Sequence, residues 1–275
     1  MPARTEPYDA PAIVTFAEEL TVWREAAELN KKQLADALGY ADSYVGQVER
    51  CKNIPSPEFA EALDTFFKTN RLFKRLWKRI IDTRHLAVLP PGFTQFLDRE
   101  AEATQVRAFN LALINGLLQT ENYARAVVGA NQQPDIVDQL VSDRLKRQTI
   151  LTREDPLHAW FTVDEVALRK MIGGPDVMCE QLEHLLTISE RPNVWLDVVP
   201  QDAGYYPGLG GDFIILGFPN APDIAYIEAG GHGMVIQEPR AVAHCSVQHN
   251  LLRGDALRVE ESLALIRSLM KEIKE

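Results

Sequence analysis

The residues best suited to chemistry lie between positions 30 and 50, where small and polar side chains are spaced for hydrogen bonding. Val45 and Val48 have the spacing of a buried helix face. The opposite face carries Asp42, Ser43, Gly46 and Gln47. A helix that presents such residues outward can place them against base edges in the major groove of DNA. Elsewhere no nucleophile, base and orienting group converge in the sequence, so we expect no catalytic residues and no enzymatic activity.

Two short helices joined by a glycine turn are expected to hold this face. Asn30 can cap the first helix, and Gly39 can adopt the positive φ angle that ends it. The second helix then begins at Ala41 or Asp42. This is the sequence form of a DNA-reading helix-turn-helix, although amphipathic helix pairs also occur in bundles that never touch DNA.

The flanking segments supply the rest of a small bundle. A helical apolar stripe precedes the pair, formed by Phe16, Leu20, Trp23 and Ala27. A further helix begins near Pro57 and has its inward side on Phe59, Leu63, Phe66 and Phe67. Residues 13–67 therefore predict a compact four-helix domain.

The run LNKKQLADALGY..SYVGQVER.K..PSPEFAEALD resembles the Xre-type helix-turn-helix domains, which are relatives of the phage repressors, over residues 13–67. The resemblance implies a double-stranded DNA operator as partner. It also implies a set of contact residues: Lys31 with Lys32 for phosphates at the start of the first helix, Asp42, Ser43, Gly46 and Gln47 for bases, and Tyr44, Arg50 and Lys52 for the DNA backbone. Asp42 and Gly46 stand where similar domains often have polar or basic readers, and Cys51 replaces the usual glycine.

Charge is distributed unevenly along the chain. The sequence has 29 Lys and Arg against 39 Asp and Glu, a net charge of −10, which argues against nonspecific coating of nucleic acid. Residues 1–67 contain six basic and twelve acidic side chains, whereas residues 68–84 contain seven basic and one acidic.

Residues 68–84 are expected to form one amphipathic helix. Its basic arc is formed by Arg71, Lys74, Arg75, Lys78 and Arg79. A solvated outer face is the favoured interpretation of this arc, ahead of a phosphate-facing strip and a membrane-surface helix. The apolar side of the helix is expected to pack on the neighbouring domain or on a second subunit.

The length of 275 residues and the 46% apolar composition favour two domains. We expect a flexible arm at 1–12, a helix-turn-helix domain at 13–67, a basic amphipathic connecting helix at 68–89 and a C-terminal domain at 90–275. Three scattered cysteines give no disulfide framework, and no membrane span or signal peptide is evident, so we expect a cytoplasmic protein.

The C-terminal half changes to helices that alternate with strands. Strands are predicted at Val106–Ile114, Ala159–Val163, Val194–Val199, Phe213–Phe218, Ile224–Ile227 and Met234–Ile236. Helices are predicted at Asp135–Leu151, Pro175–Glu190, Pro239–Leu252 and Val259–Lys274. The fold class is therefore expected to be α+β, with an N-terminal all-α helix-turn-helix bundle followed by a larger α+β sensor or interaction domain.

This half resembles the C-terminal domain of the WhiJ-like, antitoxin-like regulators of actinobacteria. The matching runs are GLLQTENYARAVV at 116–128, RLKRQ from Arg144, DEVALRKMIGGPDVMCEQLEHLL at 164–186, RPNVWLDVVP, AGYYPGL.G.F at 203–213 and DIAYIE at 223–228. Asn115 stands where similar sequences usually have proline. The resemblance implies a transcriptional regulator whose gene often lies beside one for a small BldB-like partner protein.

A cysteine and three histidines form a weak candidate for a metal site. His244, Cys245 and His249 lie on one predicted helix, and His232 could supply a third ligand. Ordinary packing is favoured because no CxxC or HExxH spacing accompanies them, so we expect no metal and no cofactor.

Two further segments carry polar groups of interest. The glycine-rich loop at 204–211 precedes a strand, which disfavours a phosphate loop, but Tyr205 and Tyr206 could close over a ligand. Asp164 is expected to cap the helix that it precedes. The arginines Arg144, Arg147 and Arg153 could pair with buried carboxylates, either for structure or for signal transmission.

These observations favour a sequence-specific DNA-binding transcriptional regulator. A single acidic helix-turn-helix module should bind weakly, and pairing two modules raises the affinity, so we expect a homodimer. The C-terminal domain would mediate dimerisation and sense a signal or a partner. The alternative is an antitoxin-like protein that mainly binds a small partner protein encoded nearby, with weak DNA binding.

Overall fold

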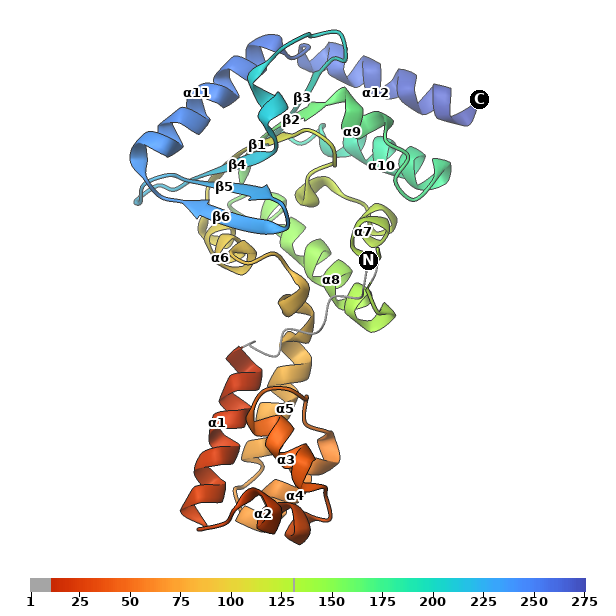
Figure 1. Ribbon diagram of the computed structural model, residues 1–275. Coiled ribbons are helices and arrows are strands. Elements are labelled where there is room, and N and C mark those ends of the chain that lie inside the picture. Colours follow the sequence, from red (N-terminus) through yellow and green to blue (C-terminus); the bar gives the residue numbers. More distant parts are fainter. Residues whose placement is uncertain (1–10, 131) are drawn as a thin grey trace. The chain divides into compact units, whose positions relative to one another are not determined.

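The computed structural model describes residues 11–130 and 132–275. The chain divides into two compact units, Met1–Val88 and Leu89–Glu275 (Figure 1). Residues 1–10 of the predicted arm lie outside the described residues, and the first helix begins at Pro11.

The N-terminal unit is a helical bundle. In its described part the helices are α1 (Pro11–Ala26), α2 (Lys31–Leu38), α3 (Asp42–Glu49), α4 (Pro57–Phe67) and α5 (Leu72–Thr83). They share one core, and its fully buried side chains include Phe16, Leu20, Leu34, Val45, Phe59, Leu63 and Phe73. The helices hold together because each contributes an apolar stripe to that core.

The fifth helix differs from the prediction of one connecting helix over 68–84. Lys68, Asn70 and Arg71 have left-handed φ angles of 56°, 50° and 64°, so the chain turns before α5 starts at Leu72. The Asp64 carboxylate accepts hydrogen bonds from the backbone N–H groups of residues 73 and 74, each at 2.9 Å, and so caps α5 from α4.

The apolar side of α5 packs on the helices of residues 11–67. It belongs to the core of its own unit, where the Phe73 and Phe16 rings lie 5.4 Å apart in an edge-to-face arrangement. Ile80 is buried in the same core. The helix therefore covers α1 and α4 of its own unit.

A six-stranded mixed sheet forms the centre of the C-terminal unit, which confirms the α+β class. Its strands are β1 (Gln105–Asn110), β2 (His158–Asp164), β3 (Val194–Val199), β4 (Phe213–Gly217), β5 (Ile224–Ala229) and β6 (His232–Ile236). The strand order is β3-β2-β1-β4-β5-β6. The pairs β1–β2 and β2–β3 are parallel, and the other three pairs are antiparallel.

Helices connect the parallel strands and cover the sheet (Figure 1). They are α6 (Phe93–Glu102) before β1, α7 (Glu121–Val128) and α8 (Pro134–Arg147) between β1 and β2, α9 (Glu165–Arg169) and α10 (Pro175–Ile188) between β2 and β3, and α11 (Pro239–Asp255) and α12 (Val259–Lys274) after β6. Such crossovers are what parallel pairing requires.

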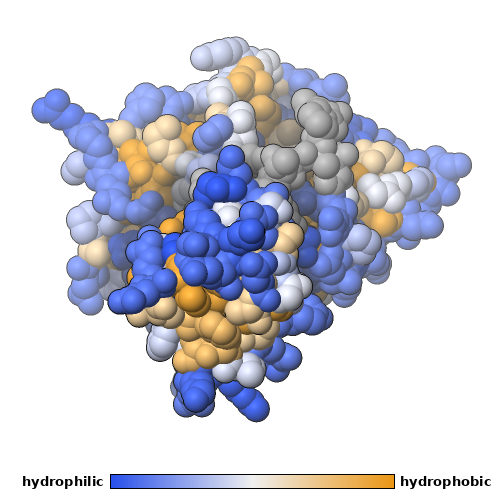
Figure 2. All heavy atoms as spheres, turned by 60° about the horizontal axis from the view of Figure 1, so that its bottom comes forward, coloured by the Kyte–Doolittle hydropathy of each residue, from blue (hydrophilic) through white to orange (hydrophobic). Residues whose placement is uncertain are grey.

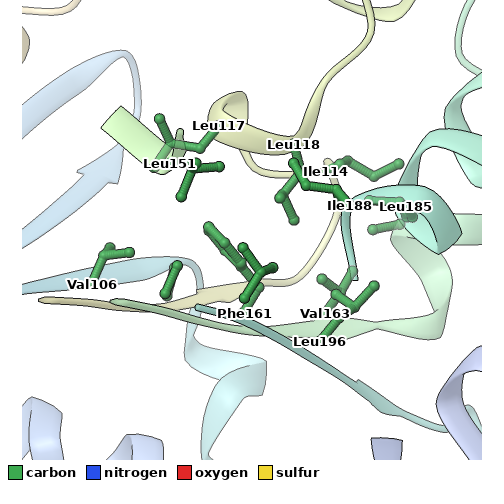
Figure 3. Packing of buried hydrophobic residues seen from close by; sticks show 14 of the residues in the cluster. Val106, Ile114, Leu117, Leu118, Leu151, Phe161, Val163, Leu185, Ile188 and Leu196 are labelled. Carbon is green, nitrogen blue, oxygen red and sulfur yellow. The ribbon is translucent and has the colours of Figure 1, made fainter. Parts of the chain in front are cut away.

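Alternating residues of the strands build a core on each face of the sheet. On one face Val106, Phe161, Val163 and Leu196 point toward Ile114, Leu117, Leu118, Leu151, Leu185 and Ile188 (Figure 3). On the other face Phe109, Phe213 and Ile215 lie under α11. Both faces are therefore buried, at least in part.

Several element boundaries differ from the sequence prediction. The first strand ends at Asn110 rather than Ile114, because the Leu111 N–H donates to Asp212 (2.8 Å) and the Ile114 N–H donates to the Tyr123 hydroxyl (3.2 Å). The predicted helix over 135–151 ends at Arg147 and continues as the 3-10 helix Gln148–Leu151. The helices α6 and α7 were not predicted.

Candidate nucleic-acid interface

The turn between α2 and α3 is fixed by local hydrogen bonds. The Asn30 side chain accepts from the Gln33 N–H (2.9 Å), and the Asn30 N–H donates to the Gln33 side chain (2.8 Å), which completes a capping box. Gly39 has a φ angle of 74° and ends α2, as predicted. The helix α3 then begins at Asp42, one of the two predicted start positions.

The polar side of α3 faces outward, with one correction. Asp42, Ser43 and Gln47 are exposed, as expected for base-reading positions. Gly46 is buried, because the Arg50 guanidinium lies over it: a Cβ atom on Gly46 would lie 3.4 Å from Arg50 Nη2. Gly46 therefore lies on the outer face but beneath the Arg50 side chain, and Arg50 occupies that surface.

A buried ion-pair network joins three helices of this region, and the sequence analysis missed it. Arg24 of α1 donates through Nε to Glu49 at the end of α3 (2.5 Å) and through Nη1 to the Leu29 carbonyl (2.8 Å). The hydrogen bond to Glu49 raises the pKa of Arg24 above its ordinary value. Lys31 of α2 pairs with the same carboxylate at 3.1 Å.

This network changes the role that can be assigned to Lys31. Its ammonium group is already paired with a carboxylate, so Lys31 is not the free phosphate contact that the resemblance implied. One signal in the sequence points to Arg24: it continues the i, i+4 spacing of Phe16 and Leu20 and so falls on the buried side of its helix.

Tyr44 lies half-buried in the bundle. Its ring stacks on Tyr40 at 5.4 Å between centroids and meets Phe59 edge-on at 5.1 Å. The hydroxyl oxygen accepts from the Ser56 N–H at 2.9 Å, at the start of α4. Tyr44 is thus a packing residue that positions α4, and its own hydroxyl hydrogen is not used in this bond.

The other cations expected at the interface are exposed. Among the described residues, no carboxylate oxygen lies within 4.0 Å of the charged groups of Lys32, Arg50 or Lys52. Residues 30–52 contain four basic and three acidic side chains, so their net charge is +1. Figure 2 turns the end of the N-terminal unit that carries α2 toward the viewer, and hydrophilic side chains gather there beside an apolar area.

The basic arc of α5 lies on a different helix surface. Arg71, Lys74, Arg75, Lys78 and Arg79 are all exposed. The helix α5 packs chiefly against α1 and α4, whereas α3 packs against α1 and α2. The exposure agrees with the favoured interpretation of a solvated face.

The two tyrosines of the predicted ligand loop point to different surroundings. Tyr205 is 89% exposed, whereas Tyr206 is 4% exposed and lies in the core beneath α11. The Tyr206 hydroxyl donates to Asp164, which also caps α9 by accepting from the Val166 N–H at 2.7 Å. The expectation that both rings close over one ligand is corrected: Tyr206 holds the loop against the end of β2.

The histidine and cysteine cluster forms no metal site in the part of the chain that the structure describes. Cys245 and His249 are buried on α11, and burial lowers the pKa of His249 to about 4. His244 is exposed and lies 3.3 Å from Gln248, and His232 is exposed on β6. Both ring nitrogens of His249 are buried without a hydrogen-bond partner among the described residues.

The arginines near α8 pair with groups other than Asp164 and Glu165. Arg147 contacts Glu100 at 2.8 Å. Arg153 donates to the carbonyls of residues 101 and 103.

Across the described ranges, no helix combines the length and apolar composition that a membrane span needs.

Two family models match the chain. A helix-turn-helix domain covers residues 15–72, and the domain of unknown function DUF5753 covers residues 93–268. No curated protein and no solved structure matches. The first match indicates DNA binding and transcription regulation, in agreement with the geometry of α2 and α3.

Proposed function

The chain belongs to the family of the domain of unknown function DUF5753, and from its helix-turn-helix domain we propose a sequence-specific transcriptional regulator that reads its operator as a homodimer. The observation that carries this proposal is the α2–α3 pair. Its first helix begins with a capping box, and ion pairs of Glu49 hold its two helices to each other and to α1. The pair nevertheless leaves Ser43 and Gln47 exposed. A rigid helix with exposed polar side chains is what direct base readout requires. The proposal includes no catalytic role, and a DNA-binding role supports a cytoplasmic location.

We assign the DNA contacts residue by residue. Gln47 and Ser43 read bases, with Asp42 at the edge of the same surface. Lys32, Arg50 and Lys52 contact phosphates, because their charges have no carboxylate partner among the described residues. Tyr44 can add a phosphate contact through its hydroxyl hydrogen, since its oxygen already accepts from Ser56.

Dimerisation follows from the small positive charge of the reader. A net charge of +1 over residues 30–52 supports few phosphate contacts per module. Two modules on one dimer raise the effective concentration of the second on the operator. We assign dimerisation, and the sensing of a signal or partner, to the C-terminal unit.

A second candidate function is favoured by the acidity of the N-terminal unit. Residues 1–67 contain twelve acidic and six basic side chains, which opposes tight DNA binding. In this antitoxin-like role the chain mainly holds a small BldB-like partner protein, and DNA binding is weak without that partner.

Base reading is tested by gel shifts and binding-site selection with DNA from upstream of the chain's own gene. Gln47→Ala should weaken binding to the preferred site by about 1–3 kcal/mol and relax the base preference at one position. Gln139→Ala, an exposed amide on α8, is the matched control and should bind as the wild type does. An equal loss on every DNA sequence would contradict the role of Gln47.

Phosphate contact and partner dependence are tested with the same DNA. Lys32→Ala should weaken binding to all sequences and reduce the salt slope by about one unit, whereas Lys146→Ala, with the same charge change on α8, should not. Binding that appears only with the small neighbouring protein would favour the second candidate function. No binding in either condition would refute the regulator.

A further inference from the structure

Two arginines of α8 lie close together in the C-terminal unit, and their charges are balanced very differently. Arg147 has a carboxylate of its own, since its Nε lies 2.8 Å from Glu100, which is only 1% exposed. The Arg147 guanidinium also lies 5.7 Å from the centroid of the Phe93 ring. Arg147 is therefore compensated inside the fold by a buried anion and an aromatic face.

Arg144 has no such compensation. Its Nη1 donates to the Gln119 side-chain oxygen at 2.7 Å, and this acceptor is neutral. Among the described residues no carboxylate oxygen lies within 4.0 Å of the Arg144 guanidinium. Burial and the nearby Arg147 lower the pKa of Arg144 to about 10. A half-buried cation beside a second cation is costly unless an anion joins it.

The loop beneath these arginines brings the two guanidinium groups together. A Cβ atom built on Gly116 would lie 2.6 Å from Arg147 Nη2 and 3.8 Å from Arg144 Nε, so both guanidinium groups lie close to this glycine. Gln148 fixes the loop by donating to the carbonyls of Gly116 (2.9 Å) and Gln119 (2.7 Å). The convergence of the arginines is thus held by the fold.

The unused donors of Arg144 are not fully enclosed by the fold. Arg144 is half-buried, and none of its nitrogens is among the fully buried polar atoms without a partner. The exposed Glu228 acts on Arg144 at longer range, and its oxygen accepts from the Tyr226 hydroxyl at 3.2 Å. The site therefore leaves guanidinium N–H groups without an acceptor among the described residues, near one exposed carboxylate.

We propose that Arg144, supported by Arg147, binds the carboxylate or phosphate group of a small ligand. A guanidinium fork matches both groups with two parallel hydrogen bonds, and a desolvated surrounding strengthens them. The ligand anion supplies the negative charge that no carboxylate of the described residues places within 4.0 Å of the Arg144 guanidinium. This inference rests on the sensing role proposed for the C-terminal unit, and it names the chemistry that the unit recognises.

The test measures the melting temperature and calorimetric binding of the full chain with inorganic phosphate and, separately, with succinate, each at constant ionic strength set by chloride. One or both probes should bind saturably, and the stronger one identifies the group recognised. Arg144→Gln and Arg144→Lys should each weaken this binding by about tenfold or more. Arg125→Gln removes the same charge from an exposed guanidinium that already faces Asp138 and Glu121, and it should bind as the wild type does.

Glu228→Gln separates ligand binding from a structural role of Arg144. Removing this negative charge should tighten anion binding by about two- to fivefold, which a purely structural arginine would not cause. No saturable response of the wild type to either probe, or an unchanged response in Arg144→Gln, would overturn the inference. Both measurements omit DNA, so their failure would leave the DNA-binding proposal standing.

Discussion

The substitution Glu49→Gln should destabilise the N-terminal unit strongly. The Glu49 side chain is 4% exposed and the Arg24 side chain is 9% exposed. Arg24 Nε lies 2.5 Å from Glu49 Oε1. The substitution removes the negative charge but leaves the Arg24 cation in place. Breaking a buried ion pair from one side costs about 3–5 kcal/mol, because the other charge stays buried without a partner.

The surroundings of Arg24 place the expected loss at the lower end of that range. Arg24 keeps its hydrogen bond to the Leu29 carbonyl (2.8 Å) and its contact with the exposed Glu25 (3.2 Å). We therefore expect the free energy of unfolding of the N-terminal unit to fall by about 3 kcal/mol. For a unit of this size, such a loss lowers the melting temperature by about 12 °C or more.

Hydrogen exchange of the backbone amides in α1, α2 and α3 measures this loss within the full chain. Glu25→Gln is the matched control: Glu25 is 65% exposed, so its contact with Arg24 should contribute less than about 1 kcal/mol. The double variant Arg24→Met with Glu49→Leu should recover most of the stability, because it leaves no charge buried alone.

The reasoning would be refuted by two results. A loss below about 1 kcal/mol in Glu49→Gln would mean that solvent screens the pair despite its burial. An equal loss in Glu25→Gln would mean that the exposed carboxylate, and not Glu49, balances Arg24.

Three further predictions concern single residues. Cys51 has a φ angle of 53°, so Cys51→Gly should raise the urea midpoint by the equivalent of about 0.5–1 kcal/mol, and a lower midpoint would contradict strain there. Burial lowers the pKa of His249 from 6.5 to about 4, so the folded protein keeps this imidazole neutral down to about pH 4, whereas the unfolded chain protonates it below about pH 6.5. Stability should therefore be lost as the pH falls from 6.5 toward 4, and His249→Leu should flatten this dependence in urea titrations. Tyr206→Phe leaves Asp164 with one donor fewer and should cost about 1–2 kcal/mol by thermal unfolding, whereas Tyr205→Phe, at an 89% exposed position, should cost almost nothing.

The sequence predicts those parts of the reader that depend on neighbouring residues. The Asn30 cap, the Gly39 turn and the inward valines of α3 each follow from contacts within one or two helical turns. The pairing of Arg24 with Glu49 spans 25 residues and depends on how α1 crosses α3. Periodicity can mark a buried position, but it does not name the partner.

The same limit explains the errors at α5 and β1. The amphipathic pattern at 68–84 shows an apolar side, but not which surface covers it, and the left-handed turn at Lys68–Arg71 uses no glycine. The early end of β1 depends on Asp212, a residue about a hundred positions away. Arg144 is a similar case, because Gln119 and Gly116 come from another loop and Glu100 from another helix.

The ion-pair network also sharpens the argument for a dimer. Of the four basic residues between 30 and 52, Lys31 is paired with Glu49, so Lys32, Arg50 and Lys52 are the charges left for phosphates. Three phosphate contacts give a salt slope of only about −2.7, which is small beside the slopes of tight operator binders. The same carboxylate that ties the three helices together thus lowers the affinity of one module. A stable reader with few free cations gains affinity most readily by pairing with a second copy.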